Sequence, residues 1–142
     1  MIEALVCMAT AIYFEARGEP TVGQIAVGQV IMSRVADHRY PDSVCDVVKE
    51  GYYYSWNPSI PIPDKCQFSF WCDGKPEEIT DKEAYAWAEE ISWGLLEGDL
   101  NIIDLTDGAT HYHAWWVRPS WSNRFTRTVR IDEHIFYRWE NE

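Results

Sequence analysis

The fold turns on residues 12–20, IYFEARGEP, where one predicted helix ends and the next begins. Before this stretch, three apolar side chains fall at i, i+3 and i+7, the spacing of one helical face: Leu5, Met8 and Ile12. This spacing predicts a helix over residues 2–17, and Glu15 is the next position on its apolar stripe. The helix should end before Pro20, because a residue preceding proline is pushed out of the α region. The sequence therefore directs a carboxylate inward near a helix end, where it needs a polar partner or an opening to solvent.

Three further helices are expected, each bounded by a capping residue and a break: residues 21–35, 42–50 and 80–97. The first begins at a T-x-x-Q capping box formed by Thr21 and Gln24. Its interior is apolar on almost every side, so it should be the buried central helix. Thr80 and Glu83 form a second capping box. The N-terminal part of the chain is therefore expected to be mainly helical.

Strand-like patterns cluster late in the chain. They predict strands over residues 66–72, 110–117, 126–131 and 134–139. The aromatic, proline-punctuated stretch 52–63 is instead typical of a surface loop near a binding site. Helices first and strands late indicate an α+β fold rather than an alternating α/β fold. With no linker in the sequence, we expect a single domain over residues 1–142.

The composition argues against several kinds of partner. The chain carries a net charge of −11. Because phosphate binding needs a basic surface, we expect no nucleic acid and no electrostatic docking on anionic membranes. No stretch approaches the ~20 apolar residues that span a bilayer, and no basic segment precedes an apolar run at the N-terminus, so no signal peptide is expected. Aromatic residues make up 15% of the chain, which suits a flat sugar ligand as well as a packed core.

Four cysteines permit two disulfides in three pairings, and the sequence leaves the pairing open: Cys7, Cys45, Cys66 and Cys72. In a straight strand, Cys66 and Cys72 would lie roughly 20 Å apart. That is too far for a bridge unless the strand bends. A four-cysteine zinc site is not expected, because no C-x2-C pair occurs.

Glu15 is the candidate acid. Cleavage of a glycosidic bond needs a carboxylic acid that stays protonated near neutral pH, and burial among apolar side chains raises the pKa of a carboxyl in that way. The purely structural alternative is a salt bridge from Glu15 to Arg17 or Arg34, or a glutamate that caps a neighbouring backbone segment. Glu19 lies beside Pro20 and is expected to be solvated or to cap the second helix. No spacing singles out a second catalytic carboxylate among Asp37, Asp42, Asp73 and Asp107.

His111 and His113 are one strand repeat apart and should point to the same face, an arrangement that metal sites use. A third ligand would have to come from a distant residue such as His134 or His38, and no H-E-x-x-H spacing occurs. We therefore expect no metal and no cofactor, and histidines that line a cleft or bond to backbone. A serine nucleophile has no support, since no G-x-S-x-G is present.

Eight short motifs follow one another along nearly the whole chain. They are YFEARGEP at 13–20, GQIAV at 23–27, SRV at 33–35, CQFSF at 66–70, CDG at 72–74, GATHYH at 108–113, P-x-W at 119–121 and H-x-F-Y at 134–137. In this order they resemble the SleB/CwlJ-type cell wall hydrolases, a family that includes spore cortex-lytic enzymes and related phage and bacterial proteins.

The resemblance implies a lysozyme-like helical core with a small antiparallel β subdomain, acting on peptidoglycan glycan strands. It implies lytic transglycosylase activity between N-acetylmuramic acid and N-acetylglucosamine, with Glu15, the first glutamate of the EARGE motif, as the catalytic residue. We then expect substrate contacts from polar residues of the motifs and from nearby rings: Gln24, Gln67, Ser69, His111, Tyr112, His113, Trp115 and Tyr54.

Alternatives to this activity stay open at the level of sequence. One is muramidase-type hydrolysis, in which water attacks, and another is a non-catalytic module whose rings bind glycans. A zinc amidase using His111 and His113 is a third. The chain is further expected to act as a monomer and as an endolysin-like enzyme, which reaches the wall from the cytoplasm with a holin or as part of a virion. Phage or bacterial origin and the preferred peptide cross-link stay open.

Overall fold

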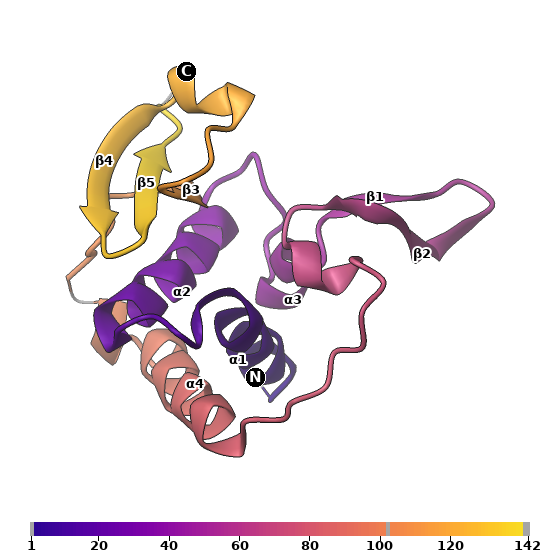
Figure 1. The fold of residues 1–142 in the computed structure, drawn as a ribbon, viewed down its shortest axis with the longest axis horizontal. Helices are drawn as coiled ribbons and strands as arrows, with labels where there is room; N and C mark the ends of the chain where they lie inside the picture. The colour runs from indigo at the N-terminus through magenta and orange to yellow at the C-terminus, as the bar shows by residue number, and fades with distance from the viewer. Residues whose placement is uncertain (1, 102, 141–142) are drawn as a thin grey trace.

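The computed structural model describes residues 2–101 and 103–140, so Met1 lies outside the described residues. Its helices are α1 (Ile2–Ala16), α2 (Thr21–Ala36), α3 (Val44–Val48) and α4 (Lys82–Leu96), with short 3-10 turns η1 (Ser69–Trp71), η2 (Asp99–Asn101) and η3 (Ser120–Asn123). Its strands are β1 (Gly51–Tyr54), β2 (Asn57–Cys66), β3 (His111–Ala114), β4 (Thr126–Ile131) and β5 (His134–Arg138). Three helices open the chain, the strands β1 and β2 precede α4, and the other three strands come last, which confirms the α+β prediction (Figure 1).

The helices pack around one apolar core built on α1. Its buried face carries Met8, Ile12 and Tyr13, all fully buried, as the stripe in the sequence predicts. Helix α4 packs on this face, and α2 contacts both helices. Gly28 of α2 permits a close approach to α4, because a Cβ at this position would collide with the side chain of Leu95. Helix α1 therefore contacts α2, α3 and α4, and Glu15 lies in its last turn.

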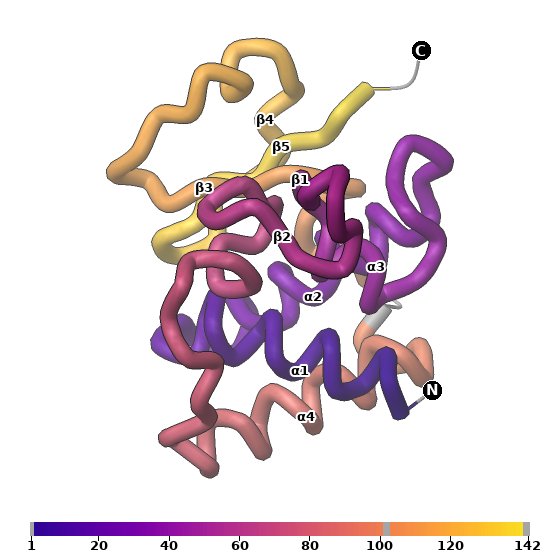
Figure 2. Tube along the Cα trace, turned by 90° about the vertical axis from the view of Figure 1, so that its right-hand side faces the viewer, coloured from indigo at the N-terminus to yellow at the C-terminus, as the bar shows by residue number. Residues whose placement is uncertain are grey.

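A three-stranded antiparallel sheet covers the other side of α2 (Figures 1 and 2). The strand order is β3-β5-β4, so β5 is the middle strand although it comes last in the chain. Phe136 of β5 is fully buried and clusters with Ala26 and Val30 of α2. The register opposes Tyr112 of β3 to Phe136, which fixes the position of Tyr112 relative to α2.

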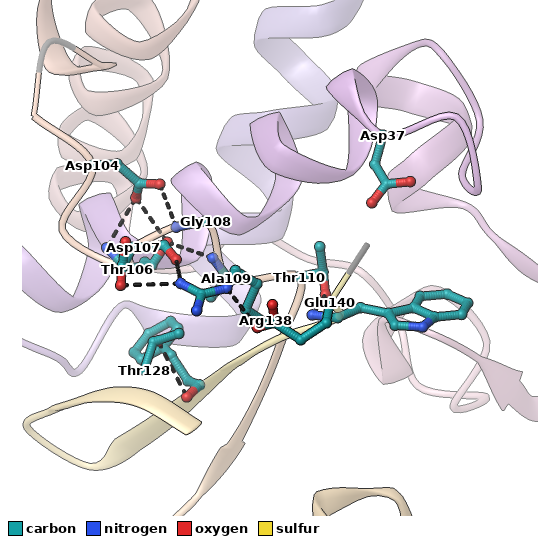
Figure 3. A network of polar contacts seen from close by, with 12 residues as sticks. Asp37, Asp104, Thr106, Asp107, Gly108, Ala109, Thr110, Thr128, Arg138 and Glu140 are labelled. Atoms are coloured by element: carbon teal, nitrogen blue, oxygen red, sulfur yellow. Dashed lines mark hydrogen bonds and ion pairs between the residues drawn. The ribbon is translucent and has the colours of Figure 1, made fainter. Parts of the chain in front are cut away.

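The loop that leads into β3 is held by a network of polar contacts, shown in Figure 3. One carboxylate oxygen of Asp104 accepts from the backbone N–H and the hydroxyl of Thr106, and the other accepts from the N–H of Gly108. Arg138 at the end of β5 donates to the carbonyl and the carboxylate of Asp107. Backbone groups that would otherwise lack partners are satisfied in this way, so β3 starts from a defined position.

The structure differs from the sequence expectations over residues 52–72. The stretch expected as a loop is a β1–β2 hairpin that projects from the body (Figure 1). The segment expected as a strand leaves the hairpin at Cys66 and coils into η1. A disulfide joins Cys66 to Cys72 with Cα atoms 6.1 Å apart, so the chain bends where alternation suggested an extended strand. A second disulfide joins Cys7 of α1 to Cys45 of α3.

Two helix caps also differ from the predictions. Helix α2 begins at Thr21 with Pro20 as its N-cap, and Gln24 donates to the carbonyl of Glu19 instead of closing a capping box. Helix α4 is capped by Asp81, whose carboxylate accepts from the N–H of Ala84. Both starts lie within a residue or two of the expected positions, where side-chain caps compete closely. Among residues 2–101 and 103–140, no helix combines the length and the apolarity needed to cross a membrane.

Candidate active site

Glu15 lies in the last turn of α1, with Oε1 accepting a 2.7 Å hydrogen bond from the hydroxyl of Tyr112. Burial raises the pKa of Glu15, while the hydrogen bond from Tyr112 and the charge of Arg34 act in the opposite direction. A carboxyl in such a place keeps its proton to higher pH than an exposed one and can still lose it to a reacting group. The surroundings of Glu15 therefore allow both the protonated carboxylic acid and the carboxylate.

Tyr112 is held from several sides. Its backbone pairs with Phe136, and its ring makes an edge contact with the ring of His134 at 5.0 Å between centroids. Burial and the neighbouring Glu15 carboxylate raise the pKa of Tyr112, so the hydroxyl remains a donor at neutral pH. Since one oxygen of Glu15 is occupied by this donor, the other is available for proton transfer.

Arg34 brings a buried positive charge to the same place. The side chain comes from α2, is 5% exposed and donates through Nε to the carbonyl of Thr110 at 2.8 Å. Its guanidinium lies over the rings of Tyr40 and Phe68, at 5.0 and 5.7 Å from their centroids. Nη1 has no hydrogen-bond partner although it is buried. An orphan donor of this kind costs free energy, which a ligand oxygen would recover.

A cavity of about 200 Å³, which we call the acid cavity, opens beside Glu15. Residues from both halves of the molecule line it: Glu15, Arg34, Gln67, Phe68, His111, Tyr112, His113, Pro119 and Trp121. A larger hollow of about 530 Å³ shares Gln67, His111 and Trp121 with the acid cavity and adds Arg124 and aromatic rings. Together they form a groove whose wall is mainly aromatic with a few polar groups, the usual make-up of a ligand site.

The two histidines of β3 are engaged by protein groups. Nδ1 of His111 lies 2.9 Å from the hydroxyl of Thr110, and its ring stacks on Phe125. Burial, with the nearby Arg34, lowers the pKa of His111 to about 4, so its ring is neutral. The nitrogens of His113 lie 2.7 Å from the carbonyl of Ala114 and 2.9 Å from the hydroxyl of Tyr137. These contacts fit the expectation of histidines that line a cleft and bond to neighbouring groups.

The structure brings together some of the substrate-contact candidates and not others. Gln67, His111, Tyr112 and His113 line the acid cavity with Glu15. Trp115 is exposed and lines a third hollow, which shares His113 with the acid cavity. The other three lie away from these hollows: Gln24 is buried under the α1–α2 turn, Ser69 is in η1, and Tyr54 packs against Trp56 on the hairpin. Their substrate contacts stay predictions.

From the sequence, neither Arg34 nor Trp121 was predicted to be a site residue, although both line the acid cavity, and no prediction was made for Glu50, which lies near Arg34 but outside the cavity lining. In the sequence, Arg34 was part of the SRV motif and a possible salt-bridge partner of Glu15, yet its Nε donates to the backbone carbonyl of Thr110. Trp121 comes from η3 and faces the cavity. The P-x-W motif at residues 119–121 was the sequence feature that could have identified Trp121 as a site residue. Glu50 has a buried oxygen without a partner, and burial raises its pKa while Arg34 lowers it. No periodic signal in the sequence marks Glu50.

The expectation that Glu19 is solvated is wrong. Its side chain is 8% exposed, and Oε1 lies 3.3 Å from Nδ1 of His134. Burial and the nearby carboxylates of Asp132 and Glu133 raise the pKa of Glu19 to about 7. The fold hides it because the β4–β5 turn folds over the α1–α2 turn, a contact between segments far apart in sequence.

Comparisons with known proteins agree on one relationship. The family model described as Cell Wall Hydrolase matches residues 18–137. A spore cortex-lytic enzyme of Bacillus cereus is 49% identical across 91% of this chain. This chain spans 33% and 42% of the first two curated relatives it matches, less than half of each.

Two solved structures share the fold. The catalytic domain of the Bacillus cereus SleB protein superposes with a TM-score of 0.68 and 25% identity, covering 97% of this chain and 91% of that one. The catalytic domain of the germination-specific lytic transglycosylase SleB from Bacillus anthracis superposes with a TM-score of 0.63 and 25% identity. The match covers 95% of this chain and 93% of that one. The family match begins just after Glu15, so the role of Glu15 is argued from its own geometry.

Proposed function

The chain belongs to the cell wall hydrolase family, and from this membership we propose that it is a lytic transglycosylase of peptidoglycan with Glu15 as its catalytic acid and base. The proposed bond joins N-acetylmuramic acid to N-acetylglucosamine. The similarity to a catalytic domain described as a germination-specific lytic transglycosylase supports the reaction type. The proposal for Glu15 is carried by one observation: a buried carboxyl with a raised pKa lies at the wall of a cavity and receives one hydrogen bond.

The reaction needs a proton to be given and then taken back. Protonated Glu15 donates to the glycosidic oxygen, the bond from that oxygen to C1 of the muramic acid breaks, and C1 acquires oxocarbenium character. Glu15, now a carboxylate, removes the proton of the C6 hydroxyl while that oxygen bonds to C1. A 1,6-anhydro ring is closed, and Glu15 is protonated again. One carboxylate therefore serves both steps, and no second carboxylate is required.

The surrounding groups suit the charge changes in this cycle. Tyr112 donates to Glu15 most strongly when Glu15 is charged, since hydrogen bonds to charged groups are the stronger ones. Arg34 also favours the carboxylate form. Its unpartnered Nη1 can donate to an oxygen of the bound sugar, such as an N-acetyl carbonyl. The ring of Trp121 offers an apolar face for a sugar ring.

Mass spectrometry of purified sacculi after digestion tests this proposal. The wild type should release muropeptides with 1,6-anhydromuramic ends, and Glu15→Gln should release about 10³-fold less, because the acid is lost while the shape is kept. Glu50→Gln, which alters another buried carboxyl in the same region, serves as the matched control and should keep most activity. Reducing ends from the wild type would instead indicate hydrolysis by water, and glycan binding without any product would indicate a binding module.

The endolysin-like role is a separate, finer proposal. We infer that a chain of this kind acts on the wall from inside a cell or from a virion and works as a monomer. Co-expression with a holin should cause lysis that expression of either protein alone does not cause. A purified protein that sediments as a dimer, or a holin-independent lysis, would contradict it.

A further inference from the structure

Positive charge is concentrated in one segment of this acidic chain. Residues 108–131 contain four arginines and neither aspartate nor glutamate, although the whole chain carries a net charge of −11. The four arginines are Arg118, Arg124, Arg127 and Arg130. Within the described part of the chain, no salt bridge joins any of them to a carboxylate. The positive charge of this segment is therefore available to an anionic ligand.

Arg118 and Arg127 line the third hollow, whose volume is about 320 Å³. Its floor is one face of the β3-β5-β4 sheet. Phe136 of β5 packs against α2, so the next residue, Tyr137, points to the opposite face, where it lines the hollow with His113. The residues between β3 and β4 lie over this face, away from the helices (Figure 2). Arg127 is opposite Tyr137 in the register of the sheet, so a strand places Arg127, whereas Arg118 comes from the covering segment.

The groups around the third hollow suit a carboxylate that is attached to a carbon chain. Two guanidinium groups present planar pairs of N–H donors, which match a carboxylate in a bidentate manner. Asn123 of η3 adds a side-chain amide that can donate to the same anion. Trp115 and Val117 add apolar surface, against which the alkyl groups beside a carboxylate can pack. Arg130 lies over the Trp115 ring, 5.7 Å from its centroid, and adds a further positive charge.

The third hollow adjoins the proposed reaction site. His113 lines both this hollow and the acid cavity that contains Glu15. In peptidoglycan, the stem peptide branches from muramic acid through a lactyl ether and carries free carboxylates. A muramic acid in the acid cavity therefore presents its peptide to the side of the glycan strand, where a neighbouring hollow can receive it.

We propose that the third hollow binds a stem-peptide carboxylate of the muramic acid whose glycosidic bond is cleaved, with Arg118 and Arg127 as the charged contacts. This assignment rests on the proposed function, because the ligand is part of the same substrate. Phosphate-containing wall polymers share the negative charge. A polymer attached at C6 is excluded from the reacting sugar, because closure of the 1,6-anhydro ring needs that hydroxyl. The enzyme should therefore prefer strands that carry stem peptides over bare glycan.

Cleavage of two matched glycan preparations tests this preference: strands with their stem peptides, and the same strands stripped of peptides by an amidase. The wild type should show a kcat/KM about tenfold higher on the peptide-bearing strands, as expected for a charge-assisted hydrogen-bonded pair. Arg127→Gln and Arg118→Gln should each lose most of this preference, chiefly through KM. Lys75→Gln, an equal charge change on an exposed residue outside the hollow, should keep it. Equal wild-type rates on both preparations, with anhydro ends still formed, would overturn this inference and leave the proposed function standing.

Calorimetric titration with an N-acetylmuramyl peptide measures binding without cleavage, because this ligand has no bond to N-acetylglucosamine. The peptide with free carboxylates should bind the wild type about tenfold more tightly than the same peptide with its carboxylates amidated. Arg127→Gln should remove this difference, and Arg127→Lys should keep only part of it, because lysine has the charge without the planar fork. Equal affinities for the free and amidated peptides, tighter binding of inorganic phosphate, or an equal loss in Lys75→Gln would contradict the assignment. This readout does not depend on which bond is cleaved, so the two proposals can fail separately.

Discussion

The smallest functional unit of the molecule is the pair Glu15 and Tyr112. Burial raises the pKa of Glu15, and the hydroxyl of Tyr112 partly offsets this by stabilising the carboxylate. In the proposed mechanism the general acid is the protonated form of Glu15, so activity should be present below the raised pKa and fall as pH rises through it. Burial, the hydrogen bond from Tyr112 and the charge of Arg34 together set the pKa of Glu15.

Tyr112→Phe removes that hydrogen bond and keeps the ring. The carboxylate loses a donor, so the pKa of Glu15 should rise further and the falling limb of the activity profile should move to higher pH. Activity at the optimum should drop about 10–100-fold, as expected for losing a hydrogen bond to a charged group. Digestion of sacculi by wild type and variant, measured from pH 4 to pH 9, checks both effects. A limb that moves to lower pH would contradict the assigned donor.

Arg34 allows charge to be separated from shape. Arg34→Met removes a positive charge that lowers the pKa of Glu15, so the falling limb should again move to higher pH. Arg34→Lys keeps the charge and should leave the limb in place, but it loses the planar fork and should raise KM about tenfold. Melting curves of both variants control for folding, since Nε holds the carbonyl of Thr110. Identical pH profiles for all three proteins would show that Arg34 is only structural.

At the scale of elements, the two disulfides fasten different parts of the fold. Cys7–Cys45 joins α1 to α3 and closes a loop with a sequence separation of 38. Cys66–Cys72 closes a short loop, with a separation of 6, at the edge of the acid cavity. Gln67 and Phe68 lie inside this short loop and line the cavity. The first bridge therefore serves stability, and the second also shapes the site.

Loop length predicts how much each bridge contributes. Cys7→Ser/Cys45→Ser should lower the free energy of unfolding by about 4 kcal/mol, because the longer loop restricts the unfolded chain more. Cys66→Ser/Cys72→Ser should lower it by about 2 kcal/mol and should reduce activity more than the first variant does. Urea denaturation gives the first quantity and sacculus digestion the second. Equal stabilities for the two variants would contradict the loop-length argument.

The sequence predicted elements where a local pattern decides them. The stripe Leu5, Met8 and Ile12 gave α1 and the inward direction of Glu15, and β4 has the predicted bounds. Residues 66–72 were misread because their alternation is real, but a covalent bridge bends the chain. The Cys66–Cys72 disulfide requires the backbone to turn back on itself within six residues. The alternation of apolar and polar side chains carries no information about such a turn.

Within the candidate site, local sequence patterns predicted the residues that lie on a strand or at a helix end. The histidines and Tyr112 were expected because they interrupt an apolar strand. The orphan Nη1 of Arg34 and the burial of Glu19 could not be expected, because both depend on contacts between distant segments: Thr110 holds Arg34, and the β4–β5 turn covers Glu19. Composition and spacing carry no signal for such contacts.

For the whole molecule, charge is the dominant property. The net charge of −11 should repel the free carboxylates of peptidoglycan stem peptides over the ~8–10 Å Debye length of physiological salt. Arginines nevertheless lie in and beside the groove: Arg124 lines the hollow next to the acid cavity, and Arg118 lines the neighbouring third hollow. Binding should therefore rest on short-range contacts, assisted locally by these side chains.

A salt titration of sacculus lysis at fixed pH checks this balance. Turnover should stay flat or improve as salt rises from low to moderate, because screening weakens the long-range repulsion. A basic wall enzyme would lose its electrostatic capture under the same conditions. Arg124→Gln should make low-salt activity worse, while Arg17→Gln, an equal change on an exposed residue outside the groove, should not. A steep loss of rate with salt would show that the local arginines outweigh the net charge.

The strand order β3-β5-β4 has a consequence for how the protein is made. A ribosome produces Glu15 well before Tyr112, and within the described part of the chain β3 pairs with β5 alone. Strand β3 therefore has no partner in its sheet until residues 134–138 emerge. Domains fold as units during synthesis, at about 5–20 residues per second. From the synthesis of Glu15 until residues 134–138 emerge, the nascent chain therefore holds this carboxyl without Tyr112 fixed against it. Under the proposed function, the cell that makes the protein meets an assembled lytic centre only after β5 has been synthesised.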